Sequence, residues 1–214
     1  MPDATAPLAD LAETAAPTGT RKRPKPGERR VQILQTLASM LEQPGGERIT
    51  TAALAARLDV SEAALYRHFA SKAQMFEGLI DFIEETVFTL INQIVEREPA
   101  GGVAAAARIA SMLVQFAERN PGMARVMVGD ALVLENERLQ QRMNQLFDKV
   151  EAALKQCLRD AVPASATPTV DAQVRAATVT AFVAGRLQRY ARSGFKRLPS
   201  EHLEPCLLYT SPSP

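Results

Sequence analysis

The sequence has few aromatic residues and almost no strand-like alternation of apolar and polar positions. Aromatic residues make up only 5% of the 214 positions, while alanine and the aliphatic residues are abundant. This balance argues against a β-sheet protein and predicts an all-α fold. The length is sufficient for one good-sized core, or for a small module fused to a larger domain.

Cysteines and long apolar runs are also scarce. The two cysteines, Cys157 and Cys206, show no pairing pattern and no metal-ligand spacing, which favours a reduced, cytoplasmic protein. No stretch approaches the roughly 20 apolar residues needed to cross a bilayer. The first residues lack the basic-then-apolar order of a secretory signal, so we expect an intracellular protein with no membrane partner.

Signatures of catalysis are missing as well. The only histidines are His68 and His202, and neither belongs to a Ser/His/Asp or Cys/His arrangement. There is no glycine-rich phosphate loop and no metal-ligand spacing. The sequence therefore favours a binding protein over an enzyme, with no cofactor and no metal.

Positive charge is concentrated near the N-terminus. Between Arg21 and Lys72 there are ten lysines and arginines against five acidic residues, which gives this segment a charge of +5. The whole chain carries only +1, so the remainder is acidic. A basic segment of this kind favours a polyanionic partner, although a solvated tail has the same composition.

Helical periodicity and turn signals divide the chain into four parts. Residues 1–26, rich in Ala, Pro and Thr, are predicted to be a disordered basic arm, and residues 27–72 a helix-turn-helix domain. Residues 73–204 are predicted to be a helical core, partner-binding and dimerisation domain, and 205–214 a tail of doubtful origin without helical period. Helices are expected near 27–43, 51–57, 62–68, 72–97, 103–119, 123–129, 132–161 and 169–193.

The segment ITTAALAARLDVSEAALYRHFASK, residues 49–72, has the pattern of a helix-turn-helix. In such a motif the second helix places its N-terminal half in the major groove, braced by the first helix. Thr50 or Thr51 can cap the bracing helix and hold a phosphate, and Ser61 can cap the reading helix.

The outward face of this motif supplies the other candidate DNA contacts. Ala63 and Ala64 are small enough to approach thymine methyl groups closely. Tyr66, His68 and Lys72 suit phosphate contacts, and Arg67 suits either phosphate or base. The sequence therefore predicts binding to double-stranded DNA.

Residues 29–80 resemble the DNA-binding domain of the TetR family of regulators, through the string Tyr-x-His-Phe-x-x-Lys in particular. The resemblance implies phosphate contacts from Tyr66 and Lys72. Many family members have glycine in the turn where this chain has Asp59, but aspartate tolerates a left-handed backbone moderately well. We expect the turn to be kept, within a TetR-like fold that joins a three-helix reading domain to a C-terminal helical dimerisation domain.

A longer resemblance, from about 29 to 195, is to the SlmA-like nucleoid occlusion branch of that family. It is carried by strings such as FAERNPGMARVM, ALVLENERLQQRMNQLFDKVEAAL and SGFK. It implies a nucleoid-associated homodimer, commonly two dimers per DNA site. It also implies recognition of the C-terminal tail of the cell-division protein FtsZ, whose polymerisation such proteins antagonise from the DNA.

The same resemblance places Arg119 and Asn120 in an FtsZ-binding region. Their plainer interpretation is a helix end, since arginine favours the C-terminal dipole and Asn-Pro is a stop signal. Phe82 lies about 120° from the centre of the apolar stripe of the long helix, so it is a candidate partner contact. Phe88 lies off the stripe on the other side of the same helix. This favours the plainer interpretation that the helix is covered by the core on both flanks.

Two further questions stay open at this level. The small residues Ala177, Ala181, Ala184 and Gly185 share one face, which suits close helix packing in a core or across a two-fold dimer interface. The alternative function is a repressor released from its operator by a small ligand. It requires a cavity with convergent polar groups, and the candidates Gln115, Arg125, Gln145 and Gln173 form no recognisable cluster.

Overall fold

The computed structural model describes residues 27–43, 49–98, 102–159 and 168–210, and these residues contain helices and no strand. The predicted arm 1–26 and the last four residues of the predicted tail lie outside them. The helices are α1 (Glu28–Leu41), α2 (Thr51–Arg57), α3 (Glu62–Tyr66), α4 (Lys72–Arg97), α5 (Gly102–Arg119), α6 (Pro121–Met127), the 3-10 turn η2 (Asp130–Leu132), α7 (Glu137–Arg159), α8 (Pro168–Arg192) and α9 (Leu203–Thr210).

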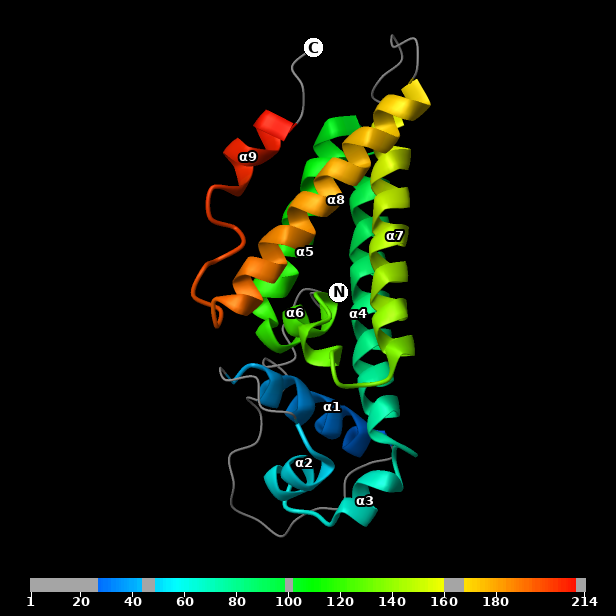
Figure 1. Ribbon diagram of the computed structural model, residues 1–214. Helices are drawn as coiled ribbons and strands as arrows, with labels where there is room; N and C mark the ends of the chain where they lie inside the picture. The colour runs from blue at the N-terminus through cyan, green and yellow to red at the C-terminus, as the bar shows by residue number, and fades with distance from the viewer. Residues whose placement is uncertain (1–26, 44–48, 99–101, 160–167, 211–214) are drawn as a thin grey trace.

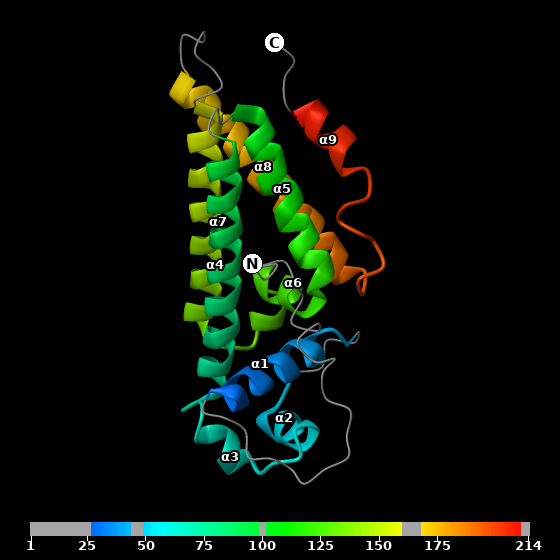
Figure 2. The ribbon, with the colours of Figure 1, turned by 180° about the vertical axis from the view of Figure 1, so that it is seen from behind.

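The helices form a small end and a long body. Helices α1 to α3 gather at one end, and α4 runs from that end along the length of the body beside α7 (Figures 1 and 2). Helix α7 packs against α4, α5 and α8, and α6 packs against α1 and α8. The all-α prediction is therefore confirmed for the described residues.

Helix α4 owes its place to the apolar stripe that the sequence predicts. The stripe has eight positions, of which only the last is partly buried and the others are buried: Phe76, Leu79, Ile80, Ile83, Val87, Leu90, Ile91 and Ile94. Its two off-stripe phenylalanines, Phe82 and Phe88, are partly buried against the same core. A helix apolar on one broad face is stable when that face is covered, here by the body of the molecule.

Charged side chains line the contact between α4 and α7. Glu77 pairs with Arg138, and Arg142 reaches Asp81 at 2.9 Å and Glu84 at 2.5 Å. The paired positions advance together along both helices, so α4 and α7 are parallel, and both begin near the small end. These ion pairs are partly exposed, so they fix the alignment of the two helices more than they stabilise the fold.

The α1–α6 contact joins the small end to the body. Gly122 lies in the first turn of α6, and a side chain there would meet the backbone of Ala38 in α1. Arg125 spans the same contact, donating to the carbonyl oxygen of Leu41 at 3.2 Å and to Asp130 at 2.7 Å.

Two of the predicted segments differ clearly from the structure. The helix expected from residue 132 is a 3-10 turn at Asp130–Leu132 followed by a loop, and α7 begins only at Glu137. The tail expected to lack helical character forms α9, because Leu203 and Leu207, one turn apart, are buried against the core. Pro205 is tolerated because it lies in the first turn, where its missing N–H would have no partner. No helix within the described part of the chain is long and apolar enough to span a membrane.

Candidate nucleic-acid interface

Two hydroxyl side chains begin the helices of the motif, as the sequence predicts. Thr50 caps α2, its Oγ1 accepting from the amide of Ala53 at 3.1 Å. Ser61 caps α3, its Oγ accepting from the amide of Ala64 at 3.3 Å. Of the two threonines that the sequence left open as caps, the structure selects Thr50.

The turn between α2 and α3 has the form of a Schellman motif. The amide of Val60 donates to the carbonyl of Ala55 at 3.0 Å, and that of Asp59 to Ala56 at 3.1 Å. Asp59 has φ of 53°, in the left-handed region where such a motif usually places glycine. The prediction that aspartate supports this turn is confirmed.

Helix α1 braces the end of the reading helix through Arg30. Its guanidinium donates to the carbonyl of His68 and lies 4.1 Å from the centroid of the buried Phe69 ring. Sequence reasoning did not single out Arg30, because its partners lie 38 and 39 positions away. The predicted helix to residue 68 ends earlier, at Tyr66, where Arg67 is the C-cap.

The outward face of α3 carries most of the predicted contacts. Tyr66 is 45% exposed and Arg67 is exposed, as are Ser61 and Ala63. Ala64 and His68 are half-buried. The motif therefore brings small, hydroxyl and basic side chains to one end of the molecule.

Thr51 and Glu62 lie at the first positions of α2 and α3 and are joined by a hydrogen bond. The Thr51 hydroxyl donates to Glu62 Oε2 at 2.5 Å. Because an ionised carboxylate only accepts, this bond occupies the single proton of Thr51.

The side chain of Lys72, the first residue of α4, is less accessible in this structure than a direct phosphate contact requires. Its ammonium pairs with Glu135 in the loop before α7, and its side chain is only 19% exposed. It also lies 5.6 Å from the centroid of the Phe76 ring. The ion pair joins the DNA-reading end to a loop of the body, 63 positions away in sequence.

Ser71 is the N-cap of helix α4. Ser71 Oγ accepts from the amide of Gln74 at 3.2 Å, which is half of a capping box. The return bond differs, since Gln74 Oε1 accepts from the amide of Ala70 at 2.8 Å.

The three predicted partner contacts differ in accessibility. Phe82 is half-buried on α4, and Arg119 is exposed at the end of α5. Asn120 is 9% exposed, and its Nδ2 donates to the carbonyl of Phe116 at 2.9 Å. The interpretation of Asn120 and Pro121 as a helix boundary is confirmed, because α5 ends at Arg119 and α6 begins at Pro121.

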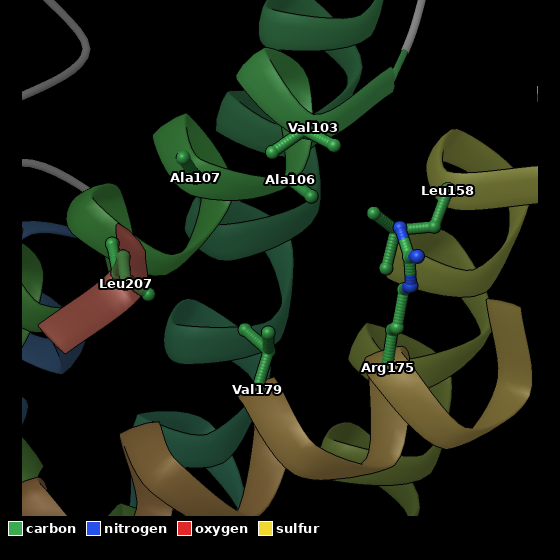
Figure 3. Close-up of a pocket in the computed structure, with 7 residues that line it drawn as sticks. All are labelled: Val103, Ala106, Ala107, Leu158, Arg175, Val179 and Leu207. Carbon is green, nitrogen blue, oxygen red and sulfur yellow. The ribbon is translucent and has the colours of Figure 1, made fainter. Parts of the chain in front are cut away.

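A small cavity lies in the body, between α5, α7, α8 and α9 (Figure 3). Its volume is about 20 Å³, which is room for about one water molecule. Arg175 is the only charged residue among those that line it: Val103, Ala106, Ala107, Leu158, Arg175, Val179 and Leu207. Of the residues proposed from sequence for a ligand pocket, Arg125 joins α1 to α6 and Gln173 donates to Glu151 at 2.6 Å.

Family models and known proteins match both parts of the chain. The model described as bacterial regulatory proteins, tetR family, matches residues 33–79, and a tetracyclin repressor-like C-terminal domain of the SlmA-like type matches residues 103–210. A nucleoid occlusion factor SlmA from Idiomarina loihiensis is 51% identical over 175 residues, 81% of this chain and 89% of that protein. One from a Marinomonas species is 50% identical over 178 residues, 83% and 90% of the two chains.

Solved structures agree in fold at much lower identity. The transcriptional regulator FadR from Bacillus subtilis, in complex with stearoyl-CoA, has a TM-score of 0.65 and 16% identity, covering 84% of this chain and 96% of its own. FadR from Bacillus halodurans has the same TM-score at 14% identity, covering 88% and 96%. Together, the family matches and the close relatives place this chain in the SlmA family of nucleoid occlusion factors, a branch of the TetR-type regulators.

Proposed function

We propose that this protein is a nucleoid occlusion factor that binds chromosomal sites as a homodimer and, from there, antagonises polymerisation of FtsZ. Division septum assembly is thereby blocked over the nucleoid. The protein is cytoplasmic and is associated with the nucleoid through its DNA sites. The observation that carries the proposal is that about half of the residues are identical to nucleoid occlusion factors over most of the chain, the second domain included. TetR-type repressors share the reading domain and diverge beyond it.

The DNA contacts are assigned to the outward face of α2 and α3. Thr50, whose oxygen accepts from Ala53, keeps its hydroxyl proton to donate to a phosphate. Tyr66, the last residue of α3, and its C-cap Arg67 are exposed for phosphate or base contacts. Tyr66→Ala should weaken binding to all DNA sequences alike, since phosphate contacts carry no sequence information, and should leave the salt dependence nearly unchanged, since a neutral hydroxyl displaces no counterion.

The homodimer is assigned to the outer face of α8. The buried face of this helix packs on the body, while Val170 and Val174 on the opposite side are 59% and 60% exposed. Ala181 and Gly185 continue the same face, and a Cβ on Gly185 would meet no atom within 4 Å. Small and apolar residues on one outward face suit close approach of a second α8 across a two-fold axis.

The FtsZ tail is assigned to the surface between α4 and α5 that includes Phe82, Arg119 and Asn120. A peptide titration tests this assignment. A synthetic FtsZ C-terminal tail is titrated into the full chain, with and without a DNA duplex that the chain binds. Saturable binding supports the proposal, and absence of binding in both states would favour the ligand-released repressor.

Charge reversal on α5 sharpens that experiment. Arg119→Asp should abolish tail binding and leave DNA affinity unchanged. Arg97→Asp, an exposed position at the end of α4, is the matched control and should change neither. Loss of both activities in Arg119→Asp would indicate misfolding, which circular dichroism would detect.

A repressor released by a small ligand would need a ligand pocket in the body of the molecule. Ligand pockets for drug-sized molecules have volumes of roughly 300–1,000 Å³. The cavity beside Arg175 holds about 20 Å³, so in this conformation it does not accommodate such a ligand. The likeness to FadR, at 16% identity, extends to the fold alone.

A further inference from the structure

Glu62 places a negative charge on the face of the molecule assigned to DNA. It is the first residue of the reading helix α3 and its side chain is exposed. A carboxylate there is repelled by phosphates, so it opposes non-specific binding. An acidic side chain stays favourable in the major groove only where it accepts a hydrogen bond from a base.

The orientation of this carboxylate is fixed by a neighbour on the other helix of the motif. Oε2 accepts the Thr51 hydroxyl at 2.5 Å, a short charge-assisted bond between the first positions of α2 and α3. The other carboxylate oxygen, Oε1, has no hydrogen-bond partner among the described residues. One oxygen is thus anchored and the other remains able to accept.

We propose that Glu62 is a specificity-determining residue that accepts a hydrogen bond from the N4 amino group of a cytosine, and that Thr51 is its positioning residue. The inference rests on the proposed binding of DNA by α3. Thr51 then acts on base recognition through Glu62, and the phosphate contact at the start of α2 falls to Thr50.

Cytosine follows from the hydrogen-bonding pattern of the major groove. Guanine presents two acceptors and thymine one, and a carboxylate can donate to none of them. Adenine offers the N6 amino group, but its N7 acceptor lies beside it and repels the second carboxylate oxygen. Cytosine presents only its N4 donor on that edge, so it is the base that an acceptor-only side chain selects.

A local structural role for Glu62 also accounts for its position, since a carboxylate in the first turn favours the helix dipole and the Thr51 bond ties α2 to α3. The variant Glu62→Gln separates the two roles. The glutamine oxygen can still accept from Thr51, so the tie is kept. With that oxygen held by Thr51, the glutamine presents an amino group in place of Oε1, so its free end donates and can no longer accept from cytosine N4.

The experiment selects binding sites from a random-sequence duplex library with the full-length chain and its variants. The wild type should recover a motif with one C·G pair in each half-site that is preferred about five- to tenfold, as expected for a single base hydrogen bond. Glu62→Gln should lose the preference for cytosine at that one pair. Thr51→Val should weaken the preference there without a new one, and Glu96→Gln, an exposed acid on α4, should leave the motif unchanged.

The outcomes are distinguishable. A Glu62→Gln motif identical to that of the wild type, or a wild-type motif without a preferred cytosine in each half-site, would overturn the assignment while DNA binding stands. Recovery of no motif by the wild type would overturn the proposed function and this inference with it. Melting curves of each variant show whether the fold is kept, so a lost motif in an unfolded variant is recognised as such.

Discussion

Gly122 is the position where the smallest substitution should have the largest effect. It lies in the first turn of α6, against α1. A methyl group built on it would lie 2.1 Å from the carbonyl oxygen of Ala38 and 3.2 Å from the Cβ of Leu41. The obstacle is helix backbone, which cannot rotate away, so Gly122→Ala requires α1 and α6 to separate.

The size of the effect follows from that distance. An ordinary carbon–oxygen contact is roughly 1 Å longer than 2.1 Å, and overpacking of this kind costs about 1–3 kcal/mol. Alanine recovers at most about 1 kcal/mol through its helix propensity. The bond from Arg125 to the Leu41 carbonyl spans the same contact and lengthens with it. We expect a net loss of about 2 kcal/mol, which is a fall in Tm of about 4–8 °C for a chain of this size.

Differential scanning calorimetry of the full chain measures this loss. Gly78→Ala is the matched control, because its Cβ would meet only the ends of the Leu34 and Phe69 side chains, at 3.1 Å and 3.4 Å. Those side chains can shift, so the Tm of Gly78→Ala should fall less. An unchanged Tm for Gly122→Ala, or an equal fall in both variants, would refute the argument from the α1–α6 contact.

Four other substitutions test the turn, the ion pair and the dimer. Asp59→Gly should raise Tm, because only glycine adopts the φ of 53° freely. Asp59→Val should lower the free energy of unfolding by about 1–2 kcal/mol for the same reason. Equal Tm values for the two variants would contradict this. Glu135→Gln releases Lys72 and should steepen the dependence of log K on log salt concentration by about 0.9, the contribution of one added phosphate contact; an unchanged slope places Lys72 away from the DNA. Gly185→Leu should leave the monomer folded and weaken the dimer in sedimentation equilibrium, and an unaltered dimer would exclude this face of α8.

The features that sequence reasoning predicts well depend on residues a few positions apart. The caps at Thr50 and Ser61 bind amides three residues on, and the left-handed turn at Asp59 closes on the helix just before it. The apolar stripe of α4 repeats every three or four residues. Each pattern is contained within one helix or turn, so local chemistry determines it.

The features that it misses depend on distant partners. Arg30 meets His68, and Lys72 meets Glu135, only because the fold brings them together. A basic residue near a reading helix looks like a phosphate contact in sequence, whichever partner it has in space. The same holds for α9, whose two buried leucines are anchored by the body and not by the helical preference of the tail.

Helix α4 relates the proposed DNA contact to the proposed partner surface. Lys72 and Phe82 are ten residues apart on it, which is about 15 Å along the axis. Charges at physiological salt are screened beyond about 8 Å, so direct electrostatic coupling between the two sites is weak. Any effect of DNA on tail affinity must therefore pass through a change of conformation, either of α4 or of the α1–α6 contact that also joins the small end to the body. DNA affinity should then fall steeply with salt, while the ratio of tail affinities with and without saturating DNA stays nearly constant. A ratio that falls in parallel with the DNA affinity would indicate charge coupling instead.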